Sequence, residues 1–248
     1  MSGARIDLNH RIHVLTRKEE LDSERARGKV VIVLDILFAT TTMVAALAEG
    51  ATDVLPVADE AAARAAGAAL VPGSYVLSGE LYADTLPGFA PPVPLALLSH
   101  GVRGKTLVYS TTNGTVAVLG SAGARRVYCG SLLNARAVAE RVAADHARDT
   151  ILILCAGSGG NFNLEDFFGA GCLVERLAAV LGVDADLSDS ARAALALYRG
   201  THAPQALLDC RVGRMMVRRG MAHEVDFACR LDAYPVVPWL DGDRLRIA

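Results

Sequence analysis

The sequence lacks several features that would assign it quickly to a class. No apolar stretch approaches the roughly 20 residues of a membrane-spanning helix, and the start, MSGARIDLNHRIH, has no apolar signal region. The net charge is only −2, so there is no basic excess for nucleic acid or an anionic membrane. We therefore expect a cytoplasmic protein with a small-molecule substrate and with neither nucleic acid nor membrane as partner.

Disulfide, zinc and nucleotide signatures are also missing. The five cysteines are scattered, none forms a CxxC pair, and their odd number argues against a disulfide framework. Most lie in apolar surroundings, where a small buried hydrophobic residue is the simpler interpretation. The six histidines form no H-x-x-x-H pair, so a zinc site is not indicated. Neither a P-loop nor a G-x-G-x-x-G fingerprint occurs.

What the sequence does contain is an alternation of short apolar runs with helical patterns. The clearest runs are Val30–Leu34, Thr106–Tyr109 and Ile151–Cys155, each followed by small and polar residues and then by a helical pattern. Such alternation predicts parallel strands connected by helices. We expect an α/β fold in three layers, a sheet with helices on both faces, forming one compact domain over residues 1–248.

Two of these units resemble each other. In residues 35–57 and 110–130, threonine is followed by a short apolar helix, then by Gly-Ala, then by a strand that contains valine. The alanine-rich composition would produce part of this likeness by chance. The pattern nevertheless indicates a weak internal duplication, in which four positions repeat at one spacing: Thr42, Gly50, Ala51 and Val54 as Thr115, Gly123, Ala124 and Val127.

Other segments give local predictions. Residues 87–94 (PGFAPPVP) should form an ordered loop or a surface crossing, because proline lacks an N–H and fixes φ. A helix is predicted around Ser190–Leu197, with a polar cap just before it. The segment LLDCRVGRMMVRRGM has helical spacing with a stop at Gly220. Asp241-Gly242 predicts a hairpin turn near the C-terminus.

Three polar loops follow the three clearest strands, at Thr40–Thr42, Ser110–Thr115 and Gly157–Asn163. Ligands of open α/β sheets gather at the carboxyl ends of strands, where helix N-termini offer unpaired N–H groups. Each loop could therefore receive an anionic group. For any single loop, helix capping by Ser, Thr or Asn is the simpler interpretation. We expect the three loops to meet at one rim of the sheet and to share a cavity.

Acids near these loops limit the chemistry. Asp35 follows a buried strand, and Glu80 follows the apolar run Tyr75–Leu77. Glu165 and Asp166 begin the third helix, where acids stabilise the helix dipole, so a structural role is the simpler interpretation for them. Asp35 differs, because a carboxylate beside an apolar strand needs partners to offset its desolvation. A set of carboxylates beside polar loops would suit phosphoryl chemistry assisted by Mg²⁺.

Familiar nucleophile patterns are incomplete. DILFAT lacks the second acid of the aspartate-nucleophile D-x-D pattern, and CAGSGGN lacks the arginine that closes a cysteine-phosphatase cradle, with Asn161 near its place. AGSGG nearly matches the G-x-S-x-G elbow, but residues 159–161 delay the helix that should follow directly. A hydrolase that uses Ser158 with His202 or His223 stays an alternative.

The motifs resemble one known family. VVIVLDILFATTT, STTNGT, CAGSGGNFNLED and DFACRLDAYPVVPWLDG are similar to motifs of the 2-phosphosulfolactate phosphatase family of coenzyme M biosynthesis, from near residue 4 to the end. The resemblance implies an α/β hydrolase, a homodimer, that uses Mg²⁺ to remove phosphate from a small acidic phosphoester. It implies catalytic and metal-binding roles for Asp35, Glu80 and Asp166. Substrate-binding positions would be Phe38, Thr41, Thr42, Ser110, Thr111, Thr112, Asn113, Gly157, Ser158 and Asn161.

The sequence departs from that family at the expected anion site. The family motif D-V-L-R-A-T-T has its arginine replaced by Phe38, and G-E-R ends here in Leu81. G-F-D-x-G-N-S-P becomes GFAPPVPL, with Ala90 in place of the acid. Bidentate arginine contacts to phosphate are strong, and losing a buried charge partner costs about 2–5 kcal/mol. We expect a more apolar pocket that binds a phosphosulfolactate-like dianion poorly.

Three functions therefore stay open. The first is the family chemistry on a changed substrate. The second is a scaffold retasked in secondary metabolism as a lyase, cyclase or non-phosphate hydrolase without metal, which Phe38, Leu81 and the proline-rich loop favour. The third is a non-catalytic binding protein. The retained string STTNGT argues against the third, because a vestigial pocket has no chemical need for it.

Overall fold

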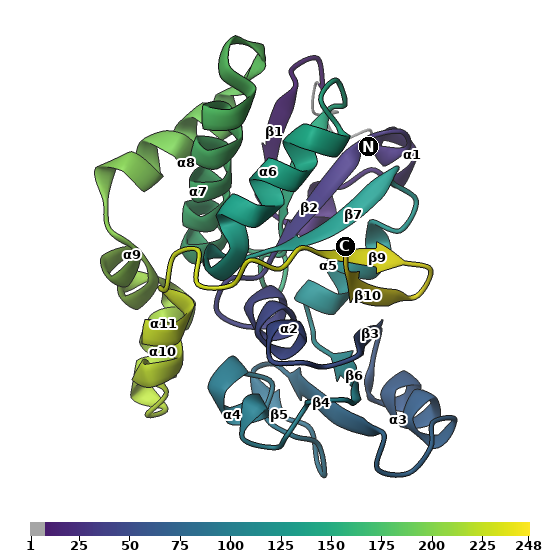
Figure 1. The fold of residues 1–248 in the computed structure, drawn as a ribbon. Coiled ribbons are helices and arrows are strands. Elements are labelled where there is room, and N and C mark those ends of the chain that lie inside the picture. Colours follow the sequence, from purple (N-terminus) through teal and green to yellow (C-terminus); the bar gives the residue numbers. More distant parts are fainter. Residues whose placement is uncertain (1–7) are drawn as a thin grey trace, which may run out of the picture.

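The computed structural model describes residues 8–248 and shows a mixed α/β fold (Figure 1). The predicted start of the domain, residues 1–7, lies outside the described residues. The strands form one sheet in the order β1-β8-β2-β7-β9-β10-β3-β6-β4-β5. Their bounds are β1 Ile12–Leu15, β2 Val30–Leu34, β3 Asp53–Val57, β4 Tyr75–Leu81, β5 Asp84–Thr85, β6 Thr106–Ser110, β7 Arg126–Gly130, β8 Ile151–Cys155, β9 Pro238–Asp241 and β10 Arg244–Ile247.

Helices connect these strands and close the C-terminal part of the chain. None of those in the described part is long and apolar enough to cross a membrane. Short 3₁₀ turns lie at η1 Lys18–Glu20, η2 Leu132–Asn134 and η3 Gly182–Asp184. The α-helices are α1 Ser23–Ala26, α2 Ala39–Ala48, α3 Glu60–Ala68, α4 Pro94–Leu98, α5 Gly114–Gly120, α6 Ala135–Asp145, α7 Leu164–Leu181, α8 Asp189–Gly200, α9 Ala203–Asp209, α10 Arg211–Arg218 and α11 Ala222–Ala228.

The sheet consists of two parallel sets joined by a hairpin. β1, β8, β2 and β7 are mutually parallel, as are β3, β6 and β4. Between the sets, β9 pairs antiparallel with β7 and β10 pairs antiparallel with β3. The predicted strands at 30–34 and 151–155 are confirmed, and the one at 106–109 extends by one residue. Along the ladder the two sets therefore run in opposite directions.

Helices cover both faces, which confirms the layered prediction. Within β2, Ile32 and Leu34 pack in a core with α6, α7 and α8. Val31 and Val33 face the other way, into a core that holds α2, α5 and residues of both strand sets. Because successive residues of a strand point to opposite faces, the continuous apolar run of β2 serves both layers. A smaller core lies under α3.

The internal duplication has a structural counterpart. β2-α2-β3 and β6-α5-β7 each cross from one strand set to the other, and β2 pairs with β7 while β3 pairs with β6. Thr40 Oγ1 accepts from the backbone N–H of Asp35 at 2.8 Å, and Thr115 Oγ1 accepts from that of Thr111 at 3.0 Å. By this bond Thr115 corresponds to Thr40. The predicted pairing with Thr42 does not match this bond, because α2 has 10 residues and α5 has 7, so the helix starts are shifted relative to Gly50 and Gly123.

The predicted helix near residues 190–197 is confirmed as α8, but the next one is broken. The segment LLDCRVGRMMVRRGM contains the end of α9 and all of α10, separated by Cys210 in extended conformation (φ −67°, ψ 162°). The Cys210 sulfur accepts from the backbone N–H of Gly213 at 3.0 Å and so caps α10. Gly220, with φ +75°, ends this region as predicted.

The predicted loop around residues 87–94 is ordered and partly internal. Its last residue, Pro94, is the first residue of α4, a position that tolerates the missing N–H. The carbonyl of Pro92 accepts from Thr42 Oγ1 at 3.0 Å and from the hydroxyl of Tyr109. The proline-rich segment is thus tied to α2 and β6.

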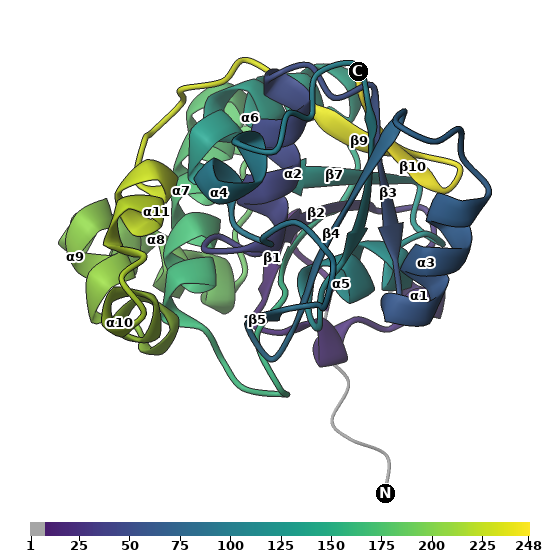
Figure 2. The same cartoon turned by 90° about the horizontal axis from the view of Figure 1, so that it is seen from below.

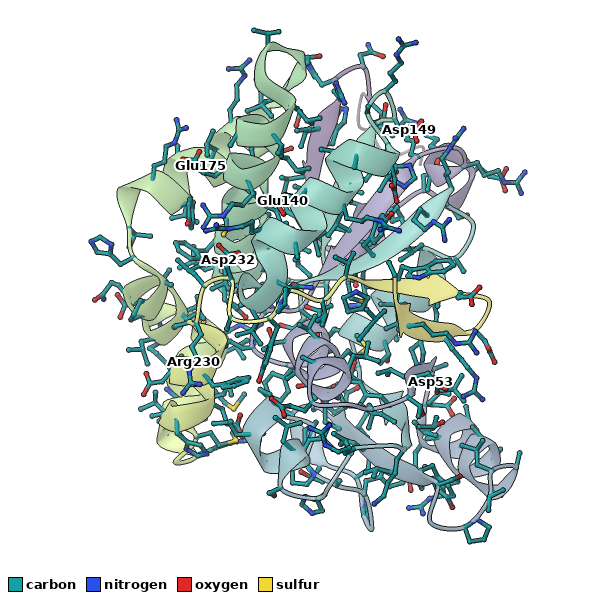
Figure 3. The ribbon with its side chains drawn as sticks, in the orientation of Figure 1. Asp53, Glu140, Asp149, Glu175, Arg230 and Asp232 are labelled. Atoms are coloured by element: carbon teal, nitrogen blue, oxygen red, sulfur yellow. The ribbon has the colours of Figure 1, made fainter. Side chains whose placement is uncertain are left out.

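The C-terminal segment is anchored near both ends by aspartates that Figure 3 labels. Asp232 pairs with Arg176 of α7 at 2.9 Å, and Asp53 of β3 pairs with Arg244 at 2.8 Å. The hairpin turn is Gly242-Asp243, not Asp241-Gly242 as predicted, because Asp241 pairs with Arg244 in the ladder. These contacts hold the chain that follows α10 and α11 across the sheet.

Candidate active site

A cavity of about 450 Å³ is lined by residues that follow β2, β6 and β8 and by residues of α10. Asp35 follows β2, Thr112 and Asn113 follow β6, and Gly157–Gly159 follow β8, and all of them line it. The predicted shared cavity is confirmed for the segment around Asp35 and for the loops after β6 and β8, but Thr40–Thr42 do not line it. The three segments do not form one rim of a parallel sheet, since the two strand sets run oppositely. The shared core around α2 and α5 brings the two sets of strand ends together.

The two halves touch at Asp35 and Gly114. A Cβ atom at position 114 would lie 2.6 Å from Oδ2 of Asp35 and 2.3 Å from Cβ of Ala39. Real Cβ atoms do not approach other atoms this closely, so only glycine fits. The start of α5 therefore lies directly against the candidate catalytic carboxylate.

The environment of Asp35 makes it an unusual acid. Burial, together with the negative charges of Glu80 and Glu165, raises its pKa from the ordinary 3.8 to about 7. The backbone N–H groups of Ala39 and Phe38 offset part of this effect. At neutral pH the carboxyl can therefore hold or release a proton, or bind a cation.

Glu80 lines the cavity, but protein donors occupy its oxygens. Oε1 accepts from the backbone N–H of Thr112 at 2.6 Å. Oε2 accepts from the backbone N–H of Ala83 at 2.6 Å and from Thr112 Oγ1 at 3.1 Å. Glu80 therefore holds the loop after β6 and the turn after β4 in place.

Asp166 lies behind the cavity rather than in its lining. Its two carboxylate oxygens accept from the backbone N–H groups of Ile36 at 2.9 Å and Gly157 at 3.1 Å. Burial, Glu165 and Asp35 raise its pKa well above the ordinary value. Asp166 thus joins the loops after β2 and β8.

Glu165 is the acid that sequence reasoning assigned to the helix dipole and so missed. It lines the cavity, is buried, and its Oε2 atom has no hydrogen-bond partner in the described structure. Burial raises its pKa. Neighbouring helical residues point about 100° apart. If one acid of the Glu165-Asp166 pair faces the cavity, the other therefore points elsewhere, and this spacing was the available signal.

Several predicted hydroxyls do not reach the cavity. Thr41 Oγ1 donates to the Ile36 carbonyl at 2.6 Å, and Thr42 Oγ1 donates to the Phe38 carbonyl at 2.7 Å. These side chains bond to the local backbone, as the capping interpretation proposes. The predicted substrate-binding residues that are buried and do not line the cavity are Thr41, Thr42, Ser110 and Thr111. The predicted residues that do line the cavity are Asp35, Phe38, Glu80, Thr112, Asn113, Gly157, Ser158 and Asn161.

Arginines from α10 complete the lining, and sequence reasoning did not assign them. Arg211 donates to Asn163 Oδ1 at 3.1 Å and contacts Ser158 Oγ. Arg218 is exposed and has no hydrogen-bond or ion-pair partner among the described residues. Because positions seven apart share a helix face, the spacing of Arg211 and Arg218 was the available signal. The expectation of a more apolar pocket did not take these guanidinium groups into account.

The third arginine, Arg219, ties α10 to the β4–β5 hairpin. It donates to the Ala83 carbonyl at 2.8 Å and pairs with Asp84 at 2.9 Å. Figure 1 and Figure 2 show α10 and β5 at the same end of the molecule. α10 and Arg219 therefore form one wall of a cavity whose other lining residues lie between Asp35 and Glu165.

The alternative nucleophiles gain no support from this geometry. Cys155 is fully buried, and burial raises the pKa of its thiol well above the ordinary value. Ser158 Oγ donates to Asn163 Oδ1 at 2.9 Å. Within the described chain, the residues that line the cavity include no histidine that could activate this serine.

The described residues form no preassembled metal site. Across residues 8–248, no three His, Cys, Asp or Glu side chains are grouped as ligands for one ion. Asp35, Glu80 and Asp166 therefore do not converge as a ready three-carboxylate set. Among the acids of the lining, Glu165 has an oxygen, Oε2, without a hydrogen-bond partner in the described structure, while Asp35 accepts from the backbone N–H groups of Ala39 and Phe38.

Comparison with known proteins identifies the family. The family model for 2-phosphosulpholactate phosphatase matches residues 15–243. A probable 2-phosphosulfolactate phosphatase from Deinococcus radiodurans is 38% identical over 214 residues, 85% of this chain and 87% of that one. The protein of the same name from Symbiobacterium thermophilum is 35% identical over 222 residues, 87% and 93% of the two chains. This chain therefore belongs to the 2-phosphosulpholactate phosphatase family.

Proposed function

We propose that this protein is a phosphoric-monoester hydrolase that acts with Mg²⁺ on a small phosphorylated acid. The observation that carries the proposal is the charge of the cavity lining, in which the acids are buried or partly buried and the arginines are exposed. Guanidinium groups suit the oxygens of phosphate and carboxylate, whereas buried carboxylates repel them unless a cation intervenes. The acids are Asp35, Glu80 and Glu165, and the arginines are Arg211, Arg218 and Arg219.

Asp35 and Glu165 are the residues that fit a hard cation. Glu165 Oε2 is buried without a partner, and burial together with neighbouring negative charges raises the pKa of Asp35. A bound cation would give Glu165 Oε2 a partner and would offset the negative charge around Asp35. One or two carboxylates with waters and substrate phosphate oxygens are the usual surroundings of Mg²⁺ in proteins. Bound there, Mg²⁺ would neutralise charge on the phosphoryl group.

The chain's own groups position the phosphoester. Arg211 and Arg218 would receive its acidic groups at the mouth of the cavity. Glu80 fixes the loop that carries Thr112, and Asp166 fixes the loops after β2 and β8, so we keep both in the proposed catalytic set as positioning residues. Phosphoryl transfer depends mainly on such positioning and on electrostatic stabilisation.

We also propose a substrate that differs from phosphosulfolactate. Phe38, which by the family motif stands in the place of an arginine, lines the cavity beside Val212 and Met215. These side chains favour a less charged organic part. The same observation supports the second candidate, a retasked enzyme of secondary metabolism, which would turn over no phosphoester.

Phosphate release separates these candidates. Purified protein is assayed with phosphoglycolate, 2-phospholactate and phenyl phosphate, with Mg²⁺ and with a chelator. We expect turnover that needs Mg²⁺ and that Asp35→Asn abolishes, while Asp226→Asn, on the exposed face of α11, retains it. No release above buffer from any ester, or equal release by Asp35→Asn, would rule out the phosphatase.

The cytoplasmic location and the homodimer belong to the proposal as well. The location is carried over from the sequence analysis, and the dimer rests on the family resemblance. Sedimentation velocity at micromolar concentration measures the second directly. A single species of 26.1 kDa, the mass of one chain, would contradict the homodimer.

A further inference from the structure

The turn between β4 and β5 has a backbone conformation that its residues disfavour. Leu81 pairs with Asp84, so the loop consists of Tyr82 and Ala83. Their φ angles are +53° and +67°. Two-residue hairpin turns with both φ angles positive normally contain glycine or asparagine, because a Cβ atom is strained there. Tyrosine and alanine are therefore costly choices at this point of the chain.

Contacts from three directions hold the turn in this conformation. The Ala83 N–H donates to Glu80 Oε2 at 2.6 Å, and the Tyr82 N–H donates to Thr112 Oγ1 at 3.2 Å. The Ala83 carbonyl accepts from Arg219 at 2.8 Å. Strain of this kind persists only where the surroundings enforce it, and it is typical of ligand-binding sites.

Folding does not explain why residue 82 is a tyrosine. The side chain is 77% exposed although it lines the cavity. Among the described residues, its ring stacks on no other ring and its hydroxyl has no hydrogen-bond partner. A large amphipathic side chain that is strained, exposed and held at the mouth of a cavity gains its contacts when a ligand is present.

The rest of the apolar lining indicates what that ligand carries. Phe38, Val212 and Met215 line the same cavity as Tyr82, and of its acids Glu80 and Glu165 are buried while Asp35 is partly buried. A phosphoester whose phosphate enters the acidic part would leave its organic group among these apolar side chains. A ring or branched apolar group can pack against both the wall and Tyr82.

We propose that Tyr82 is a specificity-determining residue, which packs its ring on the apolar organic group of a phosphomonoester. This inference rests on the proposed function for the identity of the reaction. The residue touches the part of the substrate that does not react, so its loss affects KM for substrates that carry such a group and leaves kcat nearly unchanged.

Three variants separate the ring from the strained backbone. Tyr82→Gly removes the ring and relieves the strain, Ala83→Gly relieves the strain and keeps the ring, and Tyr82→Phe removes only the hydroxyl. We expect Tyr82→Gly to raise KM for phenyl phosphate about tenfold relative to phosphoglycolate, since aromatic packing is worth about that much. The other two variants should stay within about twofold of the parent. The melting temperature of Tyr82→Gly should not fall.

Two results would overturn the inference. One is an unchanged phenyl phosphate preference in Tyr82→Gly, and the other is an equal loss in Ala83→Gly, which would assign the effect to the turn conformation. Phenylphosphonate cannot be hydrolysed as an ester. Its binding, measured by calorimetry, therefore tests the role of Tyr82 independently of the proposed phosphatase activity. If no ester is hydrolysed but Tyr82→Gly still weakens phenylphosphonate binding, the phosphatase proposal fails and the inference about Tyr82 stands.

Discussion

Asp35 and Gly114 are in contact across the two strand sets, and a Cβ atom at position 114 would lie 2.6 Å from the Asp35 Oδ2 atom. Asp35 follows β2 of one set, and Gly114 begins α5 after β6 of the other. The candidate catalytic carboxylate therefore lies at the junction of the two duplicated units. The position of the Asp35 carboxylate therefore depends on how closely the start of α5 approaches it.

Gly114→Ala should disturb both stability and activity. The added methyl group would clash with Asp35 and with Ala39, because its carbon atom would lie 2.3 Å from Cβ of Ala39. Overpacking of this kind costs about 1–3 kcal/mol of unfolding free energy. Urea unfolding measures the loss. Displacement of Asp35 should also reduce Mg²⁺-dependent phosphate release.

The matched control is Gly120→Ala in the last turn of the same helix. A Cβ atom at position 120 has nothing within 4 Å. Because alanine is the better helix former, stability should be unchanged or rise by up to about 1 kcal/mol. If both substitutions had equal effects, the close approach to Asp35 would not be what requires glycine at position 114.

Glu165→Gln should lower activity without lowering stability. The substitution keeps the shape of a buried side chain whose Oε2 atom is unpartnered, but it removes the charge proposed to hold Mg²⁺. We expect phosphate release to fall at least about 100-fold, as for other losses of electrostatic stabilisation. Glu175→Gln lies on the same helix and removes only a partly exposed pair with Arg199. It should retain full activity, and a similar loss in both variants would contradict the role of Glu165.

Stability without metal should decrease as the pH rises from about 5.5 to about 8. The pKa of Asp35 is raised from 3.8 to about 7, so between these values the folded protein binds a proton that the unfolded chain has released. This contribution is complete below the unfolded pKa and is lost as the pH rises through the folded one. Burial raises the pKa of Glu165 and Asp166 in the same direction.

Chemical unfolding at the two pH values in chelator measures this slope, and Asp35→Asn should reduce it. Mg²⁺ should restore more stability at the higher pH, because only the ionised carboxyl binds a cation. The pKa of Glu19 is lowered from 4.5, so its opposite effect falls below this pH range. A stability that increases toward the higher pH would contradict the assignment.

Arg218→Ala should weaken substrate binding and leave the fold intact. The side chain is exposed and has no partner within the described structure, so unfolding free energy should change by less than about 0.5 kcal/mol. Loss of a charge-assisted contact to an anionic group should raise KM about tenfold or more. Arg246→Ala, which removes a surface pair with Asp241, is the control. Equal KM values in both variants would exclude Arg218 from the anion site.

Local patterns were sufficient for the elements whose surroundings are uniform. The apolar runs of β2 and β8 are buried on both faces, and a strand covered on both faces needs a continuous apolar run. The acid after β2 was also recognisable, because a carboxylate beside such a run must have an unusual environment. Local spacing was insufficient for the break at Cys210, since a residue whose sulfur caps a helix looks like any other helical position.

The sequence by itself determined the strand and helix periods, the family, the acid after β2 and the two loops after β6 and β8 that line the cavity, because each depends on neighbours in the chain. Only the tertiary structure decided that Glu165 rather than Asp166 faces the cavity, that Thr41 and Thr42 bond to backbone carbonyls, and that α10 brings arginines to the mouth. The physical reason is that a side chain's direction and partners depend on packing between segments far apart in the chain. No local pattern records that packing.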